Sequence, residues 1–149
     1  DNEQIYGTTR AGGTTNFGVC ASGCGTVFKV VRQGNHWVKT DIHKFTGGSD
    51  GRTPMSGLAF NGTAHFVGTT QYGGGASCGI GCGTAFGITG GGSYLRWLSF
   101  PDPGTPTDGI QPTFGPLLHN GSSFFMVTSA GGASFSGAVV SFSDLPPGP

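Results

Sequence analysis

The chain has 149 residues, which is enough for one domain with a hydrophobic core and too few for two ordinary domains. Only 9% of the residues are charged, and seven basic residues balance seven acidic ones, so a surface that binds nucleic acid is not expected. The 31 glycines and nine prolines alternate with apolar runs that include 12 phenylalanines. This composition is typical of a turn-rich β protein and excludes a disordered chain.

The sequence begins Asp1-Asn2-Glu3, as the processed end of an exported protein would, and it has no apolar run long enough to cross a membrane. We therefore expect a secreted, extracellular or cell-surface protein without a membrane span. The near-zero net charge provides little repulsion between copies, which favours self-association.

Comparison of the sequence with itself shows one pattern three times. The motif IYGTT returns as FVGTT and, in altered form, as FMVTS, at Ile5–Thr9, Phe66–Thr70 and Phe125–Ser129. A Gly-Gly pair follows each of the three motifs, and GTVF at Gly25–Phe28 returns as GTAF 58 positions later. We interpret residues 1–149 as a single repeat domain, with copies at approximately 1–48, 49–106 and 107–149.

The middle copy reads as four short strands separated by turn residues. We expect these strands over 56–60, 63–70, 82–89 and 94–100, with a two-residue hairpin turn at Asn61-Gly62. The first copy lacks the first strand and the third lacks the last, so we expect about ten strands in two and a half to three units. Four antiparallel strands in tandem predict an all-β fold of β-propeller-like blades, with a stack or two-sheet arrangement as the alternative. An array of this size leaves open sheet edges, which invite pairing with another chain.

Three stretches of the sequence carry a resemblance to a known family. They are Tyr6–Thr9 (YGTT), Cys24–Phe28 (CGTVF) and His43–Gly51 (HKFTGGSDG), the last followed by Pro54 and Gly57. Together they resemble the GloVer-type tandem repeats of large bacterial secreted or surface proteins. The resemblance covers nearly the whole chain, although the third copy has lost its cysteines. It implies export and a propeller-like fold, and it supplies no catalytic site.

Four cysteines form two C-x3-C pairs at equivalent positions of the first two copies. We expect two disulfides, Cys20–Cys24 and Cys78–Cys82, which suit an oxidising compartment. A zinc site of four thiolates is the alternative that the spacing allows. The third copy has Phe135 in the corresponding loop, so it does without this link.

The sequence offers no catalytic constellation. No two of the four histidines stand four positions apart, the only glutamate is Glu3, and no Gly-x-Ser-x-Gly elbow occurs. Asp50 and Asp108 each precede a glycine at the same repeat position, where we expect the carboxylate to cap its own backbone. A calcium ligand is the alternative for these two. We predict a protein that is not an enzyme and has no cofactor or resident metal.

Amphipathic aromatic residues are the best candidates for ligand contact. Tyr72 lies in a Gly-rich loop and is our first choice, followed by Trp37 and Trp97, for which packing between units is the alternative. Asn61 and Asn120 stand in Asn-Gly-Thr and Asn-Gly-Ser sequons, which predict possible glycosylation, although hairpin turns alone explain Asn-Gly.

These observations predict an extracellular structural or interaction protein. We expect it to associate with itself through open β edges into a ring or a fibre. The alternative is a lectin-like carbohydrate-binding module on an oligomeric propeller.

Overall fold

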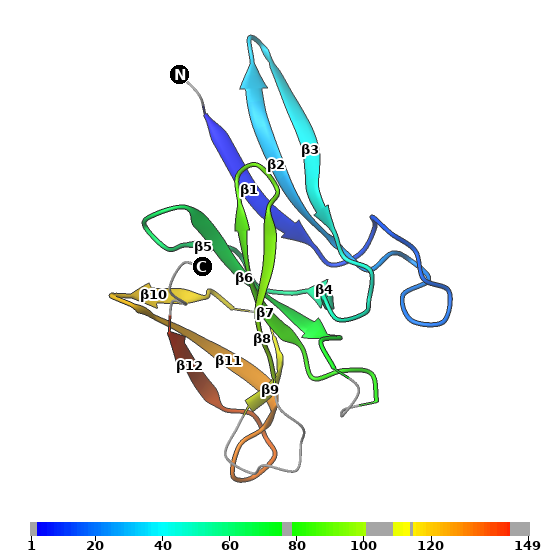
Figure 1. Ribbon diagram of the computed structural model, residues 1–149, viewed down its shortest axis with the longest axis vertical. Coiled ribbons are helices and arrows are strands. Elements are labelled where there is room, and N and C mark those ends of the chain that lie inside the picture. Colours follow the sequence, from blue (N-terminus) through cyan, green and yellow to red (C-terminus); the bar gives the residue numbers. More distant parts are fainter. Residues whose placement is uncertain (1–2, 76–78, 101–108, 114, 144–149) are drawn as a thin grey trace.

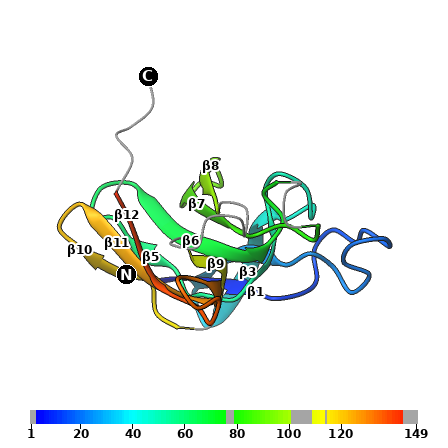
Figure 2. The ribbon, with the colours of Figure 1, turned by 90° about the horizontal axis from the view of Figure 1, so that it is seen from below.

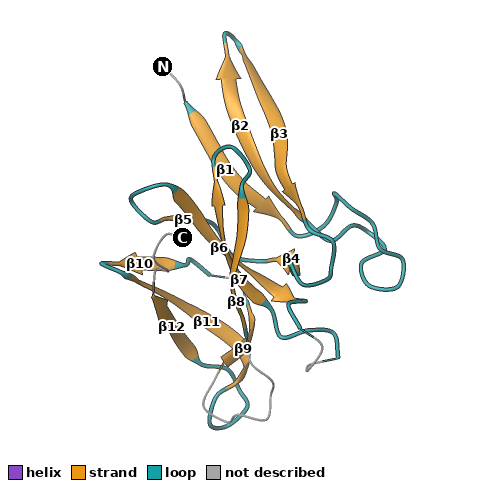
Figure 3. Ribbon diagram, in the orientation of Figure 1, coloured by secondary structure: helices purple, strands orange, loops and turns teal. Residues whose placement is uncertain are grey.

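The regular elements of the computed structural model are all β-strands (Figures 1 and 3). The structure describes residues 3–75, 79–100, 109–113 and 115–143. Within them lie twelve strands: β1 (Gln4–Thr9), β2 (Thr26–Gln33), β3 (His36–Lys44), β4 (Arg52–Pro54), β5 (Ala59–Phe60), β6 (His65–Tyr72), β7 (Thr84–Thr89), β8 (Tyr94–Ser99), β9 (Gly109–Pro112), β10 (Leu118–Asn120), β11 (Ser123–Gly131) and β12 (Val139–Ser143). No helix that could cross a membrane is found in these ranges.

The strands form three antiparallel sheets that follow one another along the chain. The first sheet has the order β1-β2-β3, the middle sheet β4-β6-β7-β8 with β5 also on β6, and the third β10-β11-β12 with β9 also on β11. Figure 2 shows the third sheet and the long loop after β1 at opposite sides of the molecule. The all-β antiparallel prediction is confirmed, whereas the described sheets form neither a closed barrel nor a closed propeller.

The first strand of the middle copy differs from its prediction because it is divided in two. Only Ala59–Phe60 of the expected run at 56–60 is a strand, and β4 precedes it; both pair with β6. Between them the Ser56 hydroxyl accepts the Thr69 N–H at 3.1 Å, in place of a strand carbonyl. In the third sheet the corresponding strand is likewise divided into two parts, β9 and β10. The described residues therefore form twelve strands and not ten.

The predicted two-residue turn at Asn61-Gly62 is also wrong. The loop runs over 61–64, because Asn61 Oδ1 accepts the backbone N–H groups of Thr63, Ala64 and His65 at 2.9–3.1 Å. This fan of hydrogen bonds delays the start of β6 to His65. In the third sheet Asn120 does pair directly with Ser123 across a two-residue turn.

In each sheet, one threonine forms a side-chain hydrogen bond to the start of the next strand, and its position is equivalent in the three sheets. Its hydroxyl accepts a backbone N–H at 3.0–3.1 Å, in the pairs Thr9 with Thr26, Thr70 with Thr84, and Thr128 with Ala138. Thr128 therefore matches Thr70, and the third motif is Phe124–Thr128 and not Phe125–Ser129. A shift of one residue matters because it moves every side chain of the strand to the other face.

The middle sheet contributes to two apolar clusters, one on each of its faces. Phe86 and Ile88 on β7 pack with Phe45 against the first sheet, whereas Ala85 packs with Phe124 towards the third. Alternate residues of a strand point to opposite faces, which explains this division. All five side chains are fully buried, so the sheets are joined face to face by continuous packing.

Candidate functional site

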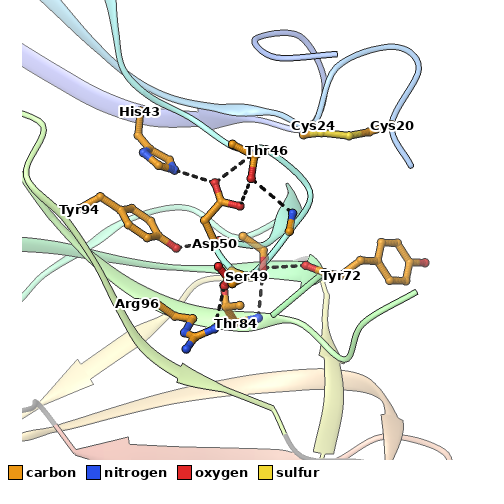
Figure 4. A network of polar contacts seen from close by, with 12 residues as sticks. Cys20, Cys24, His43, Thr46, Ser49, Asp50, Tyr72, Thr84, Tyr94 and Arg96 are labelled. Carbon is orange, nitrogen blue, oxygen red and sulfur yellow. Dashed lines mark hydrogen bonds and ion pairs between the residues drawn. A yellow bond between two sulfur atoms is a disulfide. The ribbon is translucent and has the colours of Figure 1, made fainter. Parts of the chain in front are cut away.

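A cluster of polar contacts lies in the loop between β3 and β4, where the first and middle sheets meet (Figure 4). Asp50 Oδ2 accepts the Thr46 N–H at 2.9 Å, and Oδ1 accepts the Thr46 hydroxyl at 2.6 Å. His43 Nε2 stands 3.4 Å from Asp50 Oδ2, a distance that makes an ion-pair contact when the imidazole is protonated. The carboxylate thus caps the backbone of its own loop. Asp108, its counterpart in the third copy, lies outside the described residues.

Tyr94 on β8 links this loop to the middle sheet. Its hydroxyl donates to the Asp50 carbonyl at 2.7 Å, and its ring stacks on His43 with centroids 4.1 Å apart. Burial raises the pKa of Tyr94, and the Asp50 charge raises it further. Burial also opposes the charge of Asp50, but the contacts from His43 and Thr46 outweigh it and lower the pKa of that carboxyl. At neutral pH the cluster therefore pairs a neutral phenol with a charged carboxylate.

Two arginines form hydrogen bonds to backbone carbonyls of the Gly-rich loops that follow β1, β3 and β6. Arg52 donates from Nη1 to the Val19 carbonyl at 2.9 Å and from Nη2 to the Ile80 carbonyl at 3.3 Å. Arg96 Nη1 lies 3.0 Å from the Ser49 carbonyl and 3.2 Å from the Gly74 carbonyl. Neither arginine was among the residues predicted from the sequence to form a site. The sequence held one signal for Arg52, since the third copy has the apolar Ile110 at the same position. This difference indicates that the junction between the first and middle sheets differs in polarity from the junction between the middle and third sheets.

A pocket of about 520 Å³ opens between these loops. Glycines of the loops after β1, β3 and β6 form most of its lining, and Arg52 is the one charged residue among the lining residues. His43, Asp50 and Tyr94 do not line it. The pocket therefore presents backbone groups and one guanidinium whose Nη atoms are already bonded to carbonyls, and it brings no acid–base pair to a bound molecule.

The first C-x3-C pair is joined by a disulfide, Cys20–Cys24, with Cα atoms 5.1 Å apart. It packs on the Asp50 loop, since a Cβ added at Gly47 would lie 3.1 Å from Cys24 Sγ. Cys82 is also disulfide-bonded, and Cys78, its predicted partner, lies outside the described residues. Sulfurs in disulfides are not thiolate ligands, and the described residues hold no group of three or more His, Cys, Asp or Glu suited to a metal ion.

The three aromatic residues predicted to contact a ligand lie on different parts of the molecule. Trp37 is the second residue of β3 and is half exposed, at 50%. Trp97 on β8 packs towards the third sheet, with its ring 5.8 Å from that of Phe124. The half-buried Tyr72 stacks against the Arg52 guanidinium at 5.0 Å. The structure does not bring the three together into one site.

The two sequons both lie at hairpins. Asn61 holds its turn through its side-chain oxygen, and Asn120 is exposed at the end of β10. Their glycosylation stays a prediction.

Comparison of the chain with protein-family models, with curated proteins and with solved structures found no match. The resemblance to GloVer-type repeats therefore stays a prediction from the sequence motifs.

Proposed function

We propose that this chain is an extracellular assembly module whose sheets act as propeller-like blades and whose copies associate head to tail into a ring or a fibre. The GloVer-like motifs and the Cys20–Cys24 disulfide support an exported repeat protein. One observation carries the proposal: apolar positions that are buried between sheets inside the chain are exposed on the last sheet.

The third sheet presents an apolar outer face. Val67 and Ala85 of the middle sheet are 0% exposed, because the third sheet covers them. Their counterparts one copy later are Phe125 and Val139, which are 36% and 76% exposed. Val127, 44% exposed, pairs with Val139 across the two strands. We call Phe125, Val127 and Val139 the third-sheet outer face.

The first sheet presents the complementary end. Phe86 is buried where the middle sheet meets the first, and its counterpart in β2 is the half-buried Phe28. Ile5 is 54% exposed and pairs with Val30 on the neighbouring strand. We call Ile5, Phe28 and Val30 the first-sheet outer face.

A head-to-tail contact would join these two faces as the sheets are already joined within the chain. Such a contact is heterologous, since each copy uses one face to bind and the other to be bound. Heterologous contacts close into a ring when the rotation per copy allows it and otherwise grow into a fibre. Burial of the exposed apolar area supplies the driving force, and the near-zero net charge opposes it little.

Two charged substitutions test the proposal by light scattering. Val139→Lys blocks the third-sheet outer face and Ile5→Lys the first-sheet outer face, so each variant alone is expected to stay monomeric at concentrations where the natural chain associates. An equimolar mixture is expected to form dimers and nothing larger, because each variant keeps the face that the other needs. Phe17→Lys is the matched control, since Phe17 is 89% exposed in a loop and belongs to neither face.

Association of Val139→Lys as strong as that of the natural chain, or a mixture that stays monomeric, would contradict head-to-tail assembly. The carbohydrate-binding alternative has no comparable support, because the aromatic residues that would form its site lie apart.

A further inference from the structure

Consecutive sheets are joined by a short backbone clip. At the first junction the Thr53 N–H, on β4, donates to the Cys24 carbonyl of the first sheet at 2.8 Å. Pro54 then lies against Gly25, where an added Cβ would stand 2.5 Å from Pro54 Cδ. Gly25 has a φ of 100°, a conformation that favours glycine. We call residues 50–54 the clip segment and Gly25 its glycine seat. The contact requires a glycine on one sheet and a proline from the next.

The second junction repeats the clip with different side chains. The Gln111 N–H donates to the Cys82 carbonyl at 2.8 Å, and Pro112 lies against Gly83, which again has a φ of 100°. Thr53 and Gln111 share a φ of 57°, which is uncommon for residues other than glycine. Both clips follow Asp-Gly in the sequence, so the clip segment has the pattern Asp-Gly-x-x-Pro.

A third seat exists on the third sheet without a clip. Gly137 has a φ of 102°, and its N–H donates to Gly131 as the N–H of Gly83 donates to Gly73, at 3.0 and 3.1 Å. The three heavy atoms nearest to the position that its Cβ would take belong to Thr128 and Ser129, and no proline is among them as it is at Gly25 and Gly83. Ser136, which stands where Cys24 and Cys82 stand, is exposed, and no described N–H donates to its carbonyl.

In the part of the chain that the structure describes, the first sheet shows an uncovered strand edge, which is the other half of the same junction. In the middle sheet the clip pairs with β6, as Pro54 with Thr70 and Arg52 with Tyr72. In the third sheet Pro112 pairs with Thr128 in the same way. Thr9 is their counterpart on β1, and no described strand pairs with that side of β1. At each internal junction one clip segment covers a glycine seat and pairs with a strand edge. Among the described residues, Gly137 and the edge of β1 are without such a segment.

We propose that the head-to-tail contact between copies takes up, in trans, an Asp-Gly-x-x-Pro strand of a further repeat unit, in the conformation of the two internal clips. Its proline rests on Gly137 of one copy, the N–H before the proline donates to the Ser136 carbonyl, and its backbone runs antiparallel along β1 of the next copy. Addition of a strand to a sheet edge is a general mode of peptide recognition, in which main-chain hydrogen bonds supply the affinity. This inference rests on the proposed function and names the partner segment of the same interface.

A synthetic peptide with the sequence of residues 49–60 (SDGRTPMSGLAF) tests the clip on the intact chain. Fluorescence anisotropy of the labelled peptide is expected to show saturable binding, and the peptide with Pro54→Ala is expected to bind about tenfold more weakly because the proline no longer covers the glycine seat. Hydrogen exchange of the chain is expected to slow at 4–11 and 136–140 when the peptide is added. These measurements change only the peptide, so no variant has to fold.

Absence of binding, equal binding of the Pro54→Ala peptide, or protection confined to other segments would overturn the clip. The outcome is separate from that of the assembly test. A chain that associates but does not bind the peptide supports the proposed function and overturns the clip. A chain that binds the peptide but never associates supports binding of the clip segment and overturns self-assembly.

Discussion

At the scale of single residues, a buried threonine hydroxyl is the contact that recurs in every sheet. Thr70 is fully buried; its hydroxyl donates to the Tyr72 carbonyl at 3.0 Å and accepts the Thr84 N–H at 3.1 Å. A hydroxyl has one hydrogen, so the 2.8 Å contact between the two threonine hydroxyls has Thr84 as its donor. All three groups would lose a hydrogen bond without Thr70.

We expect Thr70→Val to lower the free energy of unfolding by about 2 kcal/mol, because the volume is kept while buried polar groups lose their bonds. Urea denaturation measures the loss. Thr9→Val is the matched control, since Thr9 makes the same contacts in a partly exposed position where water can replace them. Equal losses in the two variants would contradict the role of burial.

The Asp50 carboxylate should make stability depend on pH in acid solution. Its pKa lies below the ordinary 3.8 in the folded protein, so its charge stabilises the fold fully above pH 3.8, and this stabilisation is lost as the pH falls through the lowered value. We expect Asp50→Asn to be less stable than the natural chain at pH 7, with the difference shrinking below pH 3.8. Thermal denaturation at a series of pH values measures it.

Asp41→Asn serves as the comparison for this prediction. Asp41 pairs with Lys39 near the surface of the first sheet, where an ion pair contributes little to stability. If Asp50→Asn is less stable than the natural chain by the same amount at all pH values, the carboxylate does not act through its charge.

At the scale of elements, β7 is the strand on which the packing depends, because it is buried on both faces. Every residue of β7 from Thr84 to Ile88 is buried, whereas the matching strand β2 is buried only at its first two residues. The difference arises because the middle sheet has a neighbour on each side. The same side chain should therefore contribute differently in the two strands.

We expect Phe86→Ala to cost about 3–5 kcal/mol, since it removes a fully buried ring from between two sheets. Phe28→Ala at the matching position should cost about half as much, because Phe28 lies on the first-sheet outer face with a neighbour on one side only. Chemical denaturation of both variants gives the comparison. A larger loss at Phe28 would mean that the first sheet is covered in solution.

Strand positions could be predicted from the sequence better than their limits. Alternation of apolar residues and Gly-rich breaks located β6, β7 and β8 to within two residues. The division of the first strand could not be foreseen, because it depends on a bond between Ser56 and Thr69, thirteen positions apart. The one-residue error in the third motif arose because similarity favoured Phe125, whereas the hydrogen bond of Thr128 decides the register.

At the scale of the whole molecule, the middle sheet couples the other two. It supplies side chains to both apolar clusters, so loss of any one sheet exposes buried area on its neighbour. Where packed units follow one another along a chain, stability is approximately the sum of the stabilities of the units and of their junctions. When the junctions are strong, a protein with few units unfolds in a single cooperative transition.

We expect a single cooperative unfolding transition over the whole chain. The two tryptophans report different regions, with Trp37 in the first sheet and Trp97 between the middle and third sheets. In the variant Trp97→Phe, fluorescence of Trp37 should change together with the circular dichroism signal, and in Trp37→Phe the fluorescence of Trp97 should do so. Separate midpoints in either variant would show that the junctions are weak.

The sequence by itself showed the recurring motif and predicted the all-β class and the Cys20–Cys24 disulfide, because periodicity, glycine turns and a loop of five residues depend on neighbours along the chain. Only the tertiary structure decided the rest. It separated Tyr72 from the two tryptophans, brought Arg52 to the loops of two sheets, and left Val139 exposed where Ala85 is covered. Those outcomes depend on which face of a sheet meets another sheet, and contacts between residues far apart in the chain set that arrangement.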